Sequence, residues 1–125
     1  MPDKKRILII DDEEDFGKMV KLNLERTSEF VVKTETKGAN ALKTARDFKP
    51  DLIFLDVIMP DVDGGEVMAQ LKEYNEFKNI PVVFLTAIIT DKEASSQDGV
   101  VAGRPFLAKP ITTAKLIACI KMYLP

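Results

Sequence analysis

Short runs of apolar residues alternate along the chain with segments whose apolar residues recur at helical spacing. Three runs are almost continuously apolar and rich in β-branched or aromatic residues: Arg6–Ile10, Leu52–Leu55 and Val82–Leu85. Such runs are typical of strands buried on both faces of a parallel sheet. In Val31–Thr36, β-branched residues alternate with charged ones, which indicates a half-exposed edge strand. Phe106–Ala108 is a short fifth candidate, and Pro105 before it is tolerated only at a sheet edge.

Four segments carry apolar residues at helical spacing. They contain Phe16, Met19, Val20 and Leu24; Ala41, Leu42, Ala45 and Phe48; Val67, Met68, Leu71 and Tyr74; and, in a helix from about Thr112, Leu116, Ile117, Ile120 and Leu124. One more helix, the fourth of five in chain order, belongs between Thr90 and Gly103. Serine, aspartate and glycine give this segment a low helix propensity. The alternation amounts to five β-α units. It predicts an α/β fold with a parallel sheet, helices on both faces and right-handed crossovers.

Length and composition predict one domain, spanning residues 1–125, with a single core. The hydrophobic fraction of 46% and charged fraction of 30% are typical of a soluble globular protein. The sequence contains no apolar run long enough to span a membrane and no signal-peptide pattern, so we expect no membrane association and a cytoplasmic location. Eighteen basic against twenty acidic residues argue against a nucleic-acid surface.

Two residue types narrow the chemistry further. The chain has no histidine, which excludes histidine-based catalysis, most transition-metal sites and a Ser-His-Asp triad. Its single cysteine, Cys119, cannot form an internal disulfide and lies in an apolar stretch, so we expect a small core residue.

Polar residues end the hydrophobic runs. Asp11 and Asp12 follow the first predicted strand, Asp56 ends the third, Thr86 the fourth and Lys109 the fifth. In an open parallel α/β sheet the carboxyl ends of the strands form one edge, and ligands bind in the crevice there. We therefore expect three carboxylates, a hydroxyl and an ammonium group to converge at this edge.

The charges of these groups indicate their chemistry. Three clustered carboxylates repel one another, so at least one is hard to ionise unless a cation intervenes. Oxygen ligands with room for water favour Mg²⁺. A hydroxyl donor and an ammonium group are suited to the charge that develops on a transferring phosphoryl group, and a carboxylate can accept that group covalently.

Each residue also has a structural interpretation. The acidic run Asp11–Glu14 would be favourable at the start of a helix, and Asp56 precedes turn-forming residues. Thr86 could simply end a strand, and Lys109 could be an exposed lysine before Pro110. For each residue alone the structural interpretation is favoured; the shared sheet edge favours a functional site.

Four segments carry a resemblance that covers the whole chain: ILIIDDEEDF, DLIFLDVIMPDVDGG, VVFLTA and FLAKP. Their acidic pair, LD-x-x-MP-D-x-DG block, T-A dipeptide and K-P occur in the order found in response-regulator receiver domains of two-component signalling, such as chemotaxis regulators. The resemblance implies a flavodoxin-like, doubly wound sheet of five parallel strands in the order 2-1-3-4-5, with five helices.

The same resemblance assigns the acidic residues their roles. Asp56 matches the phosphoacceptor of the family. Asp12 matches a direct Mg²⁺ ligand, and Asp11 a neighbour that often acts through water. The backbone carbonyl of Ile58 matches a third protein contact to the metal.

It also assigns the remaining polar residues and one aromatic. Thr86 matches the hydroxyl that bonds a phosphoryl oxygen, and the small Ala87 leaves that oxygen room. Lys109 matches the lysine that pairs with the phosphoryl group. Phe106 matches an aromatic that turns inward when Thr86 moves, although a core aromatic would look the same in sequence.

The function implied is a phosphorylation-controlled switch and not an enzyme acting on other substrates. A sensor histidine kinase, a phosphotransfer protein or a small acyl phosphate would supply the phosphoryl group. The fourth helix, fifth strand and fifth helix would then control a protein partner or an attached effector domain. The chain departs from the family at Ala102–Pro105 and at Ile111, on this output face.

Three other classes fit less well. A haloacid-dehalogenase-like phosphatase needs a second aspartate where this chain has Ile58. A flavodoxin would need a Ser/Thr/Gly-rich loop where this chain reads DDEED. A receiver-like module that only binds proteins would lack a site residue, and all of them are present.

Overall fold

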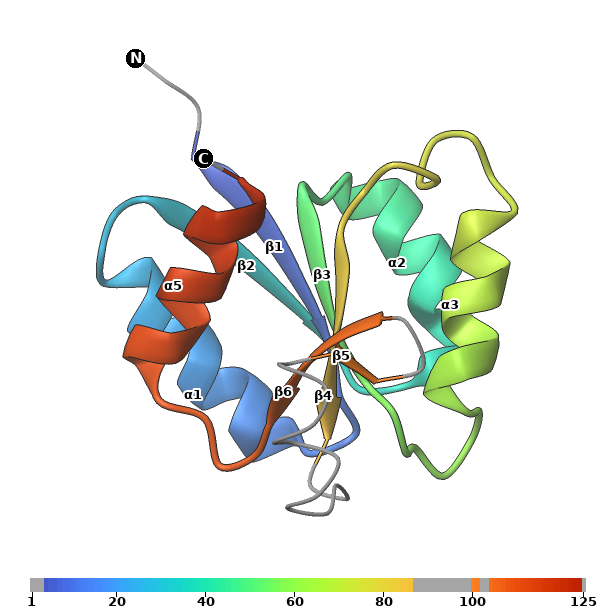
Figure 1. Ribbon diagram of the computed structural model, residues 1–125, viewed down its shortest axis with the longest axis horizontal. Helices are drawn as coiled ribbons and strands as arrows, with labels where there is room; N and C mark the ends of the chain where they lie inside the picture. The colour runs from blue at the N-terminus through green and yellow to red at the C-terminus, as the bar shows by residue number, and fades with distance from the viewer. Residues whose placement is uncertain (1–3, 87–99, 102–103, 125) are drawn as a thin grey trace.

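The computed structural model describes residues 4–86, 100–101 and 104–124. Its strands form one sheet in the order β2-β1-β3-β4-β6-β5 (Figure 1). They are β1 Lys5–Ile10, β2 Phe30–Glu35, β3 Leu52–Asp56, β4 Val82–Thr86, β5 Val100–Val101 and β6 Arg104–Ala108. The first four and β6 are parallel, so the expected flavodoxin-like order 2-1-3-4-5 is confirmed, with β6 as the fifth parallel strand.

The two-residue strand β5 was not predicted. It runs antiparallel to β6, with Val100 opposite Pro105 and Val101 opposite Arg104. The parallel ladder between β4 and β6 begins only at Phe106, after the proline that has no N–H to donate. The expected fourth helix falls mostly outside the described residues.

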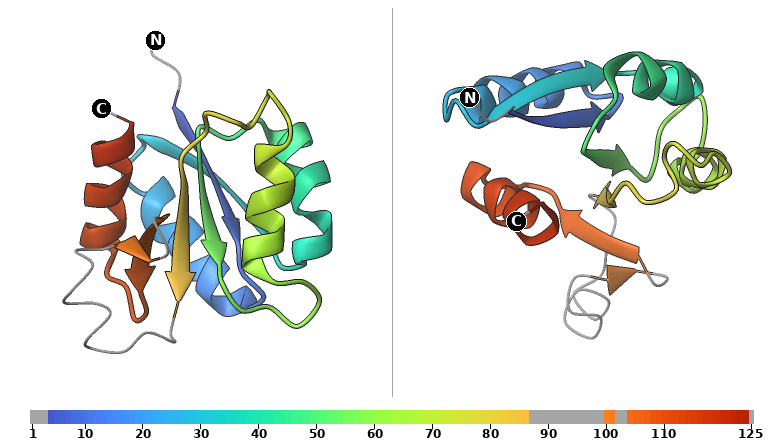
Figure 2. Two further views of the ribbon diagram at one scale, coloured as in Figure 1. Left: turned by 45° about the vertical axis from the view of Figure 1, so that its right-hand side comes forward. Right: turned by 90° about the horizontal axis from the view of Figure 1, so that it is seen from above.

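Helices cover both faces of the sheet (Figures 1 and 2). They are α1 Glu14–Glu25, α2 Ala41–Phe48, α3 Gly64–Lys72 and α5 Thr113–Tyr123, with a short 3₁₀ turn, η1, at Gly38–Asn40. Helices α1 and α5 lie on one face, and α2 and α3 on the other. Among the described residues, no helix is long and apolar enough to cross a membrane.

The alternation of strand residues divides the core between the two faces. Ile7 and Ile9 of β1 pack with residues of α1 and α5, whereas Leu8 and Ile10 pack with residues of α2 and α3. These four side chains are at most 1% exposed. Cys119 is buried on the α1–α5 side, as expected for a small core residue, and burial raises its pKa to about 11.

Two residues of the predicted helix patterns do not face the core. Met19 is 46% exposed because its neighbour Val20 takes the position toward the sheet. Tyr74 lies beyond the end of α3 at Lys72, and its ring packs against Arg46 of α2 at 4.7 Å from the guanidinium carbon.

Side chains from α1 bind the backbone of the edge strand β2. The amide of Val32 donates to Glu25 Oε2 at 3.0 Å, and Lys21 Nζ donates to the carbonyl of Val32 at 2.7 Å. Lys21 and Glu25 also pair with each other at 3.3 Å. The outward-facing hydrogen-bonding groups of Val32 are therefore occupied within the chain.

Candidate functional site at the carboxyl edge of the sheet

The sheet brings the predicted polar residues to one edge. Asp11 directly follows β1, Asp56 and Thr86 end β3 and β4, and Lys109 directly follows β6. In the parallel register Asp56 lies opposite Leu85, and Thr86 lies opposite Ala108. The amide of Lys109 donates to the carbonyl of Thr86 at 2.8 Å, which continues this ladder by one residue.

Three carboxylates form the centre of the site. One oxygen from each of Asp11, Asp12 and Asp56 lies within 4.8 Å of the others. Asp11 and Asp56 are buried, and Asp12 is exposed. Backbone amides hold the two buried groups, because Glu13 N donates to Asp11 Oδ1 at 2.9 Å and Ile58 N to Asp56 Oδ1 at 3.3 Å.

The ammonium group of Lys109 lies among the carboxylates but not closest to Asp56. Its Nζ is 2.6 Å from Asp11 Oδ2, 2.8 Å from Glu13 Oε1 and 3.9 Å from Asp56 Oδ2. It also lies 4.5 Å from the centre of the Phe16 ring. Apart from the ion pair with Lys109, Asp11 Oδ2 has no hydrogen-bond partner among the described residues.

Burial raises the pKa of Asp56 to about 7. The charge of Asp11 adds to this, as does a hydrogen bond with Asp12, while Lys109 and the amide of Ile58 act in the opposite direction. Burial lowers the pKa of Lys109, but hydrogen bonds with Asp11 and Glu13 outweigh it and leave that pKa raised. The lysine is therefore charged at neutral pH, and Asp56 is only partly ionised without a further cation.

The donor set fits a hard divalent cation. Its three side chains offer carboxylate oxygens, and one of these, Asp11 Oδ2, is buried with the Lys109 ammonium as its one partner in the described part of the chain. Mg²⁺ prefers such oxygen ligands and keeps several of its waters, which exposed Asp12 would allow. After burial, the charge of Asp11 is the next largest cause that raises the pKa of Asp56, and such an ion would neutralise that charge.

The loop after Asp56 is held tightly against the strand end. A Cβ atom at Gly64 would lie 2.3 Å from the carbonyl oxygen of Asp56, so only glycine fits. The amide of Gly64 donates to the carbonyl of Val57 at 2.9 Å. Asp63 caps α3 by accepting from Gly65 N at 2.6 Å. The sequence block D-x-DG thus closes the loop as well as starting the helix.

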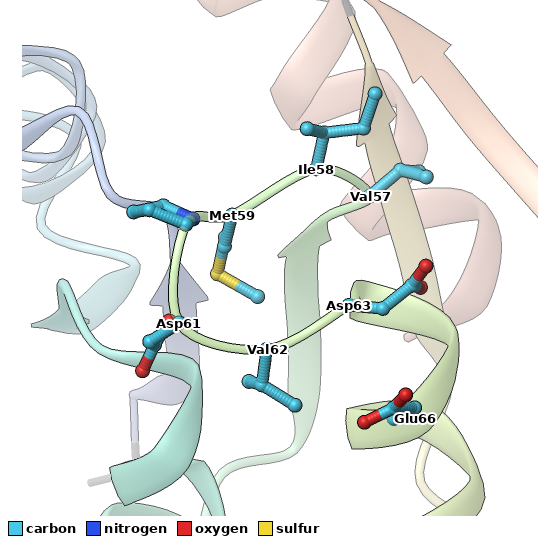
Figure 3. A pocket seen from close by; sticks show the side chains of 8 residues that line it. Val57, Ile58, Met59, Asp61, Val62, Asp63 and Glu66 are labelled. Atoms are coloured by element: carbon cyan, nitrogen blue, oxygen red, sulfur yellow. The ribbon is translucent and has the colours of Figure 1, made fainter.

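This loop curls around a hollow of about 270 Å³, lined by residues 57–63 and Glu66 (Figure 3). The Met59 side chain points into the loop and is 7% exposed, whereas Ile58 points away and is 55% exposed. Asp61 ties the loop to η1 by accepting from the amides of Gly38 and Ala39 at 3.3 and 3.0 Å. None of Asp11, Asp12 and Asp56 lines this hollow.

The two predicted switch residues are both buried. Thr86 is 5% exposed and Phe106 is 6% exposed, on neighbouring strands β4 and β6. Ala87 lies outside the described residues. Sequence analysis assigned Glu13 no role in the site, because nothing in a run of five consecutive acids, Asp11–Asp15, indicates that one of them pairs with Lys109.

The doubly wound sheet with its acidic group at the carboxyl ends of the strands is that of a flavodoxin-like α/β protein. Residues 7–121 match the response regulator receiver domain family. The polar-differentiation response regulator DivK of Brucella anthropi is 35% identical over 122 residues, which cover 96% of each chain. The chain therefore belongs to the response regulator receiver domain family, a class of signalling switches.

A second relative and a solved structure agree with this family assignment. The alkaline phosphatase synthesis transcriptional regulatory protein PhoP of Bacillus subtilis is 38% identical over 121 residues, which cover 96% of this chain but 48% of PhoP. The chemotaxis response regulator CheY4 of Vibrio cholerae superposes with a TM-score of 0.81 at 26% identity, covering 98% of this chain and 100% of that structure.

Proposed function

We propose that this receiver domain, residues 1–125, accepts a phosphoryl group on Asp56 and signals through the resulting aspartyl phosphate. The observation that carries the proposal is the buried carboxylate of Asp56 beside Asp11 and Asp12, with the Lys109 ammonium 3.9 Å away. A carboxylate oxygen of Asp56 would form a bond to phosphorus as the bond from phosphorus to the donor breaks. The donor would be the phosphohistidine of a sensor histidine kinase or phosphotransfer protein, or a small acyl phosphate.

Three groups of the chain would assist this transfer. The Lys109 ammonium would balance charge on the transferring oxygens, and the Thr86 hydroxyl would donate a hydrogen bond to one of them. Asp11, Asp12, Asp56 and the Ile58 carbonyl would hold Mg²⁺. Bound there, Mg²⁺ would neutralise the carboxylates and stabilise the negative charge of the phosphoryl group.

The output would be a shift between two conformations. Thr86 and Phe106 are buried on the adjacent strands β4 and β6, and we propose that Phe106 repacks when Thr86 moves toward a phosphoryl group. We propose that this shift alters the surface formed by β6, α5 and the segment before them. A downstream partner or an effector domain would recognise the altered surface. The setting would be the cytoplasm, where sensor kinases present their phosphohistidine.

Phosphorylation with acetyl phosphate and Mg²⁺ tests the proposal directly. Intact-mass measurement should find one added phosphoryl group in the wild type, and none after Asp56→Asn or chelation of the metal. Asp47→Asn is the matched control, because Asp47 is an exposed acid of α2 outside the carboxylate group. An adduct that persists in Asp56→Asn, or a wild type that neither acetyl phosphate nor a phosphorylated kinase can modify, would refute it.

A further inference from the structure

Glu13 makes a contact that its place in the chain does not require. It occupies the N-cap position of α1, yet its side chain makes no capping hydrogen bond. Its Oε1 instead lies 2.8 Å from Lys109 Nζ, a residue 96 positions further along the chain. The side chain of Glu13 is 62% exposed, whereas that of Lys109 is 11% exposed. An exposed carboxylate at the start of α1 therefore binds a nearly buried ammonium group.

Among the described residues, most side chains that contact the Lys109 ammonium belong to one segment of the chain. Asp11, Glu13 and Phe16 all belong to the turn after β1 and the first turn of α1, and they lie 2.6 Å, 2.8 Å and 4.5 Å from the ammonium nitrogen. Asp56 is more distant, at 3.9 Å. The lysine is thus held on the β1–α1 side of the site.

We propose that Glu13 is a positioning residue that holds Lys109 on the β1–α1 side until a phosphoryl group on Asp56 draws the ammonium away. The inference rests on the proposed function. An ammonium group has three N–H donors and can exchange one carboxylate partner for a phosphoryl oxygen. Glu13 is the partner most easily released, because it is exposed and Asp11 is buried.

Releasing Glu13 costs free energy, so the contact should oppose the phosphorylated state. Exposed ion pairs are worth little, and their loss corresponds to about a twofold to fivefold change in an equilibrium constant. Glu13→Gln keeps the shape of the side chain and removes its charge. It should therefore bind beryllofluoride, a phosphoryl mimic, about twofold to fivefold more tightly than the wild type in the presence of Mg²⁺.

The neighbouring residue Glu14 provides a matched control. It has the same charge at the same helix start, but it pairs with Lys18 at 3.0 Å, on the exposed face of α1. Glu14→Gln removes the same favourable interaction with the helix dipole without touching Lys109. Its affinity for beryllofluoride, measured by isothermal titration calorimetry, should stay close to that of the wild type.

Repeating the measurement in a Lys109→Gln variant distinguishes positioning of Lys109 from direct repulsion between the Glu13 carboxylate and the bound anion. If Glu13 acts through Lys109, Glu13→Gln should change beryllofluoride affinity in the wild type and leave it unchanged in Lys109→Gln. Repulsion between Glu13 and the anion would persist in both backgrounds. Urea unfolding of the metal-free single and double variants gives an independent readout, because the two side chains should show a favourable coupling.

The outcomes are distinct. Equal affinities of Glu13→Gln and Glu14→Gln, an effect that persists in Lys109→Gln, or no coupling in the metal-free protein would each overturn the positioning role while leaving the proposed function intact. A wild type that binds no beryllofluoride and accepts no phosphoryl group would overturn the proposed function itself.

Discussion

The carboxyl of Asp56 is in an environment that favours its neutral form. Burial first, and then the charge of Asp11, raise its pKa to about 7 from an ordinary value of 3.8. When the pKa of a carboxyl is higher in the folded than in the unfolded chain, its protonation stabilises the fold. This contribution is fully present at pH values below the pKa of the unfolded chain, and it is lost as the pH rises through the pKa of the folded chain. The site therefore works against the stability of the domain at neutral pH.

This gives a pH-dependent prediction for Asp56→Asn. The amide cannot ionise, so in chelator the variant should gain stability relative to the wild type as the pH rises from about 4 to about 7, by on the order of 2–4 kcal/mol. Urea unfolding at pH 5 and pH 8 measures the difference, with Asp47→Asn as the exposed control. A constant difference at both pH values would show that Asp56 is ionised throughout.

Gly64 is the second residue on which the site depends. Its missing side chain lets the loop pass against the strand end, since a Cβ would lie 2.3 Å from the carbonyl oxygen of Asp56 and 2.8 Å from Val57 Cα. Both neighbours are backbone atoms and cannot rotate away. Any other residue must displace the strand end or the loop.

Gly64→Ala should destabilise the domain by about 1–3 kcal/mol, in the range of overpacking substitutions, and should slow phosphorylation of Asp56. Gly65→Ala is the control, because its Cβ would meet only a side-chain oxygen, Asp63 Oδ1, at 3.1 Å. Alanine is also the better helix former, so this variant should be neutral or slightly more stable. Thermal melts of the two variants compare them, and a Gly64→Ala melt equal to that of Gly65→Ala would contradict the steric explanation.

At the scale of helices and strands, most elements of the fold were predictable from the apolar runs and the helical spacing of apolar residues. The five parallel strands were predictable because continuous apolar runs such as Leu52–Leu55 are typical of strands buried in a parallel sheet. Their order was expected only from the resemblance to receiver domains. The strand β5 was not, since two residues carry no period. Tyr74 was assigned to the core by spacing alone, and its stacking on Arg46 depends on where α3 ends.

Some contacts of the candidate site were likewise predictable from the sequence, and others were not. Residues at the ends of strands were predictable because a parallel sheet brings those ends together. The pairing of Glu13 with Lys109 was not, because the acidic run looks alike at each position and the choice of partner is made by tertiary contacts. The hydrogen bonds that Asp61 accepts from Gly38 and Ala39 were also not predictable, because an aspartate in a turn gives the same sequence signal whether or not it binds another loop.

At the scale of the whole molecule, β2 is one of the two edge strands of the sheet, where another chain could pair. Lys21 and Glu25 occupy the hydrogen-bonding groups of Val32 that face outward. The bond from Val32 is the largest cause that lowers the pKa of Glu25. Stability from Glu25 is therefore present above its ordinary pKa and is lost as the pH falls through the lowered one. Edge strands left with free backbone groups promote association between chains.

Replacing Lys21 and Glu25 together with alanine should expose these groups and favour self-association at high protein concentration. The matched control is Glu14 and Lys18 replaced with alanine, an exposed pair on the same helix that touches no strand. We expect the edge variant to lose about 1–2 kcal/mol more stability than the control, as when backbone hydrogen-bond partners are removed. Sedimentation velocity and urea unfolding test both effects; two variants that remain equally monomeric and equally stable would rule out a protective role.

The division of the core by the sheet has a consequence for synthesis on the ribosome. Among the described residues, the buried members of the cluster on the α2–α3 side all come from residues 8–82, whereas the cluster on the α1–α5 side also includes Ile111, Leu116, Cys119 and Ile120. A growing chain can therefore cover one face of the sheet while the other still waits for α5. During that interval the apolar residues beside α1 are the surface that nascent-chain chaperones would meet.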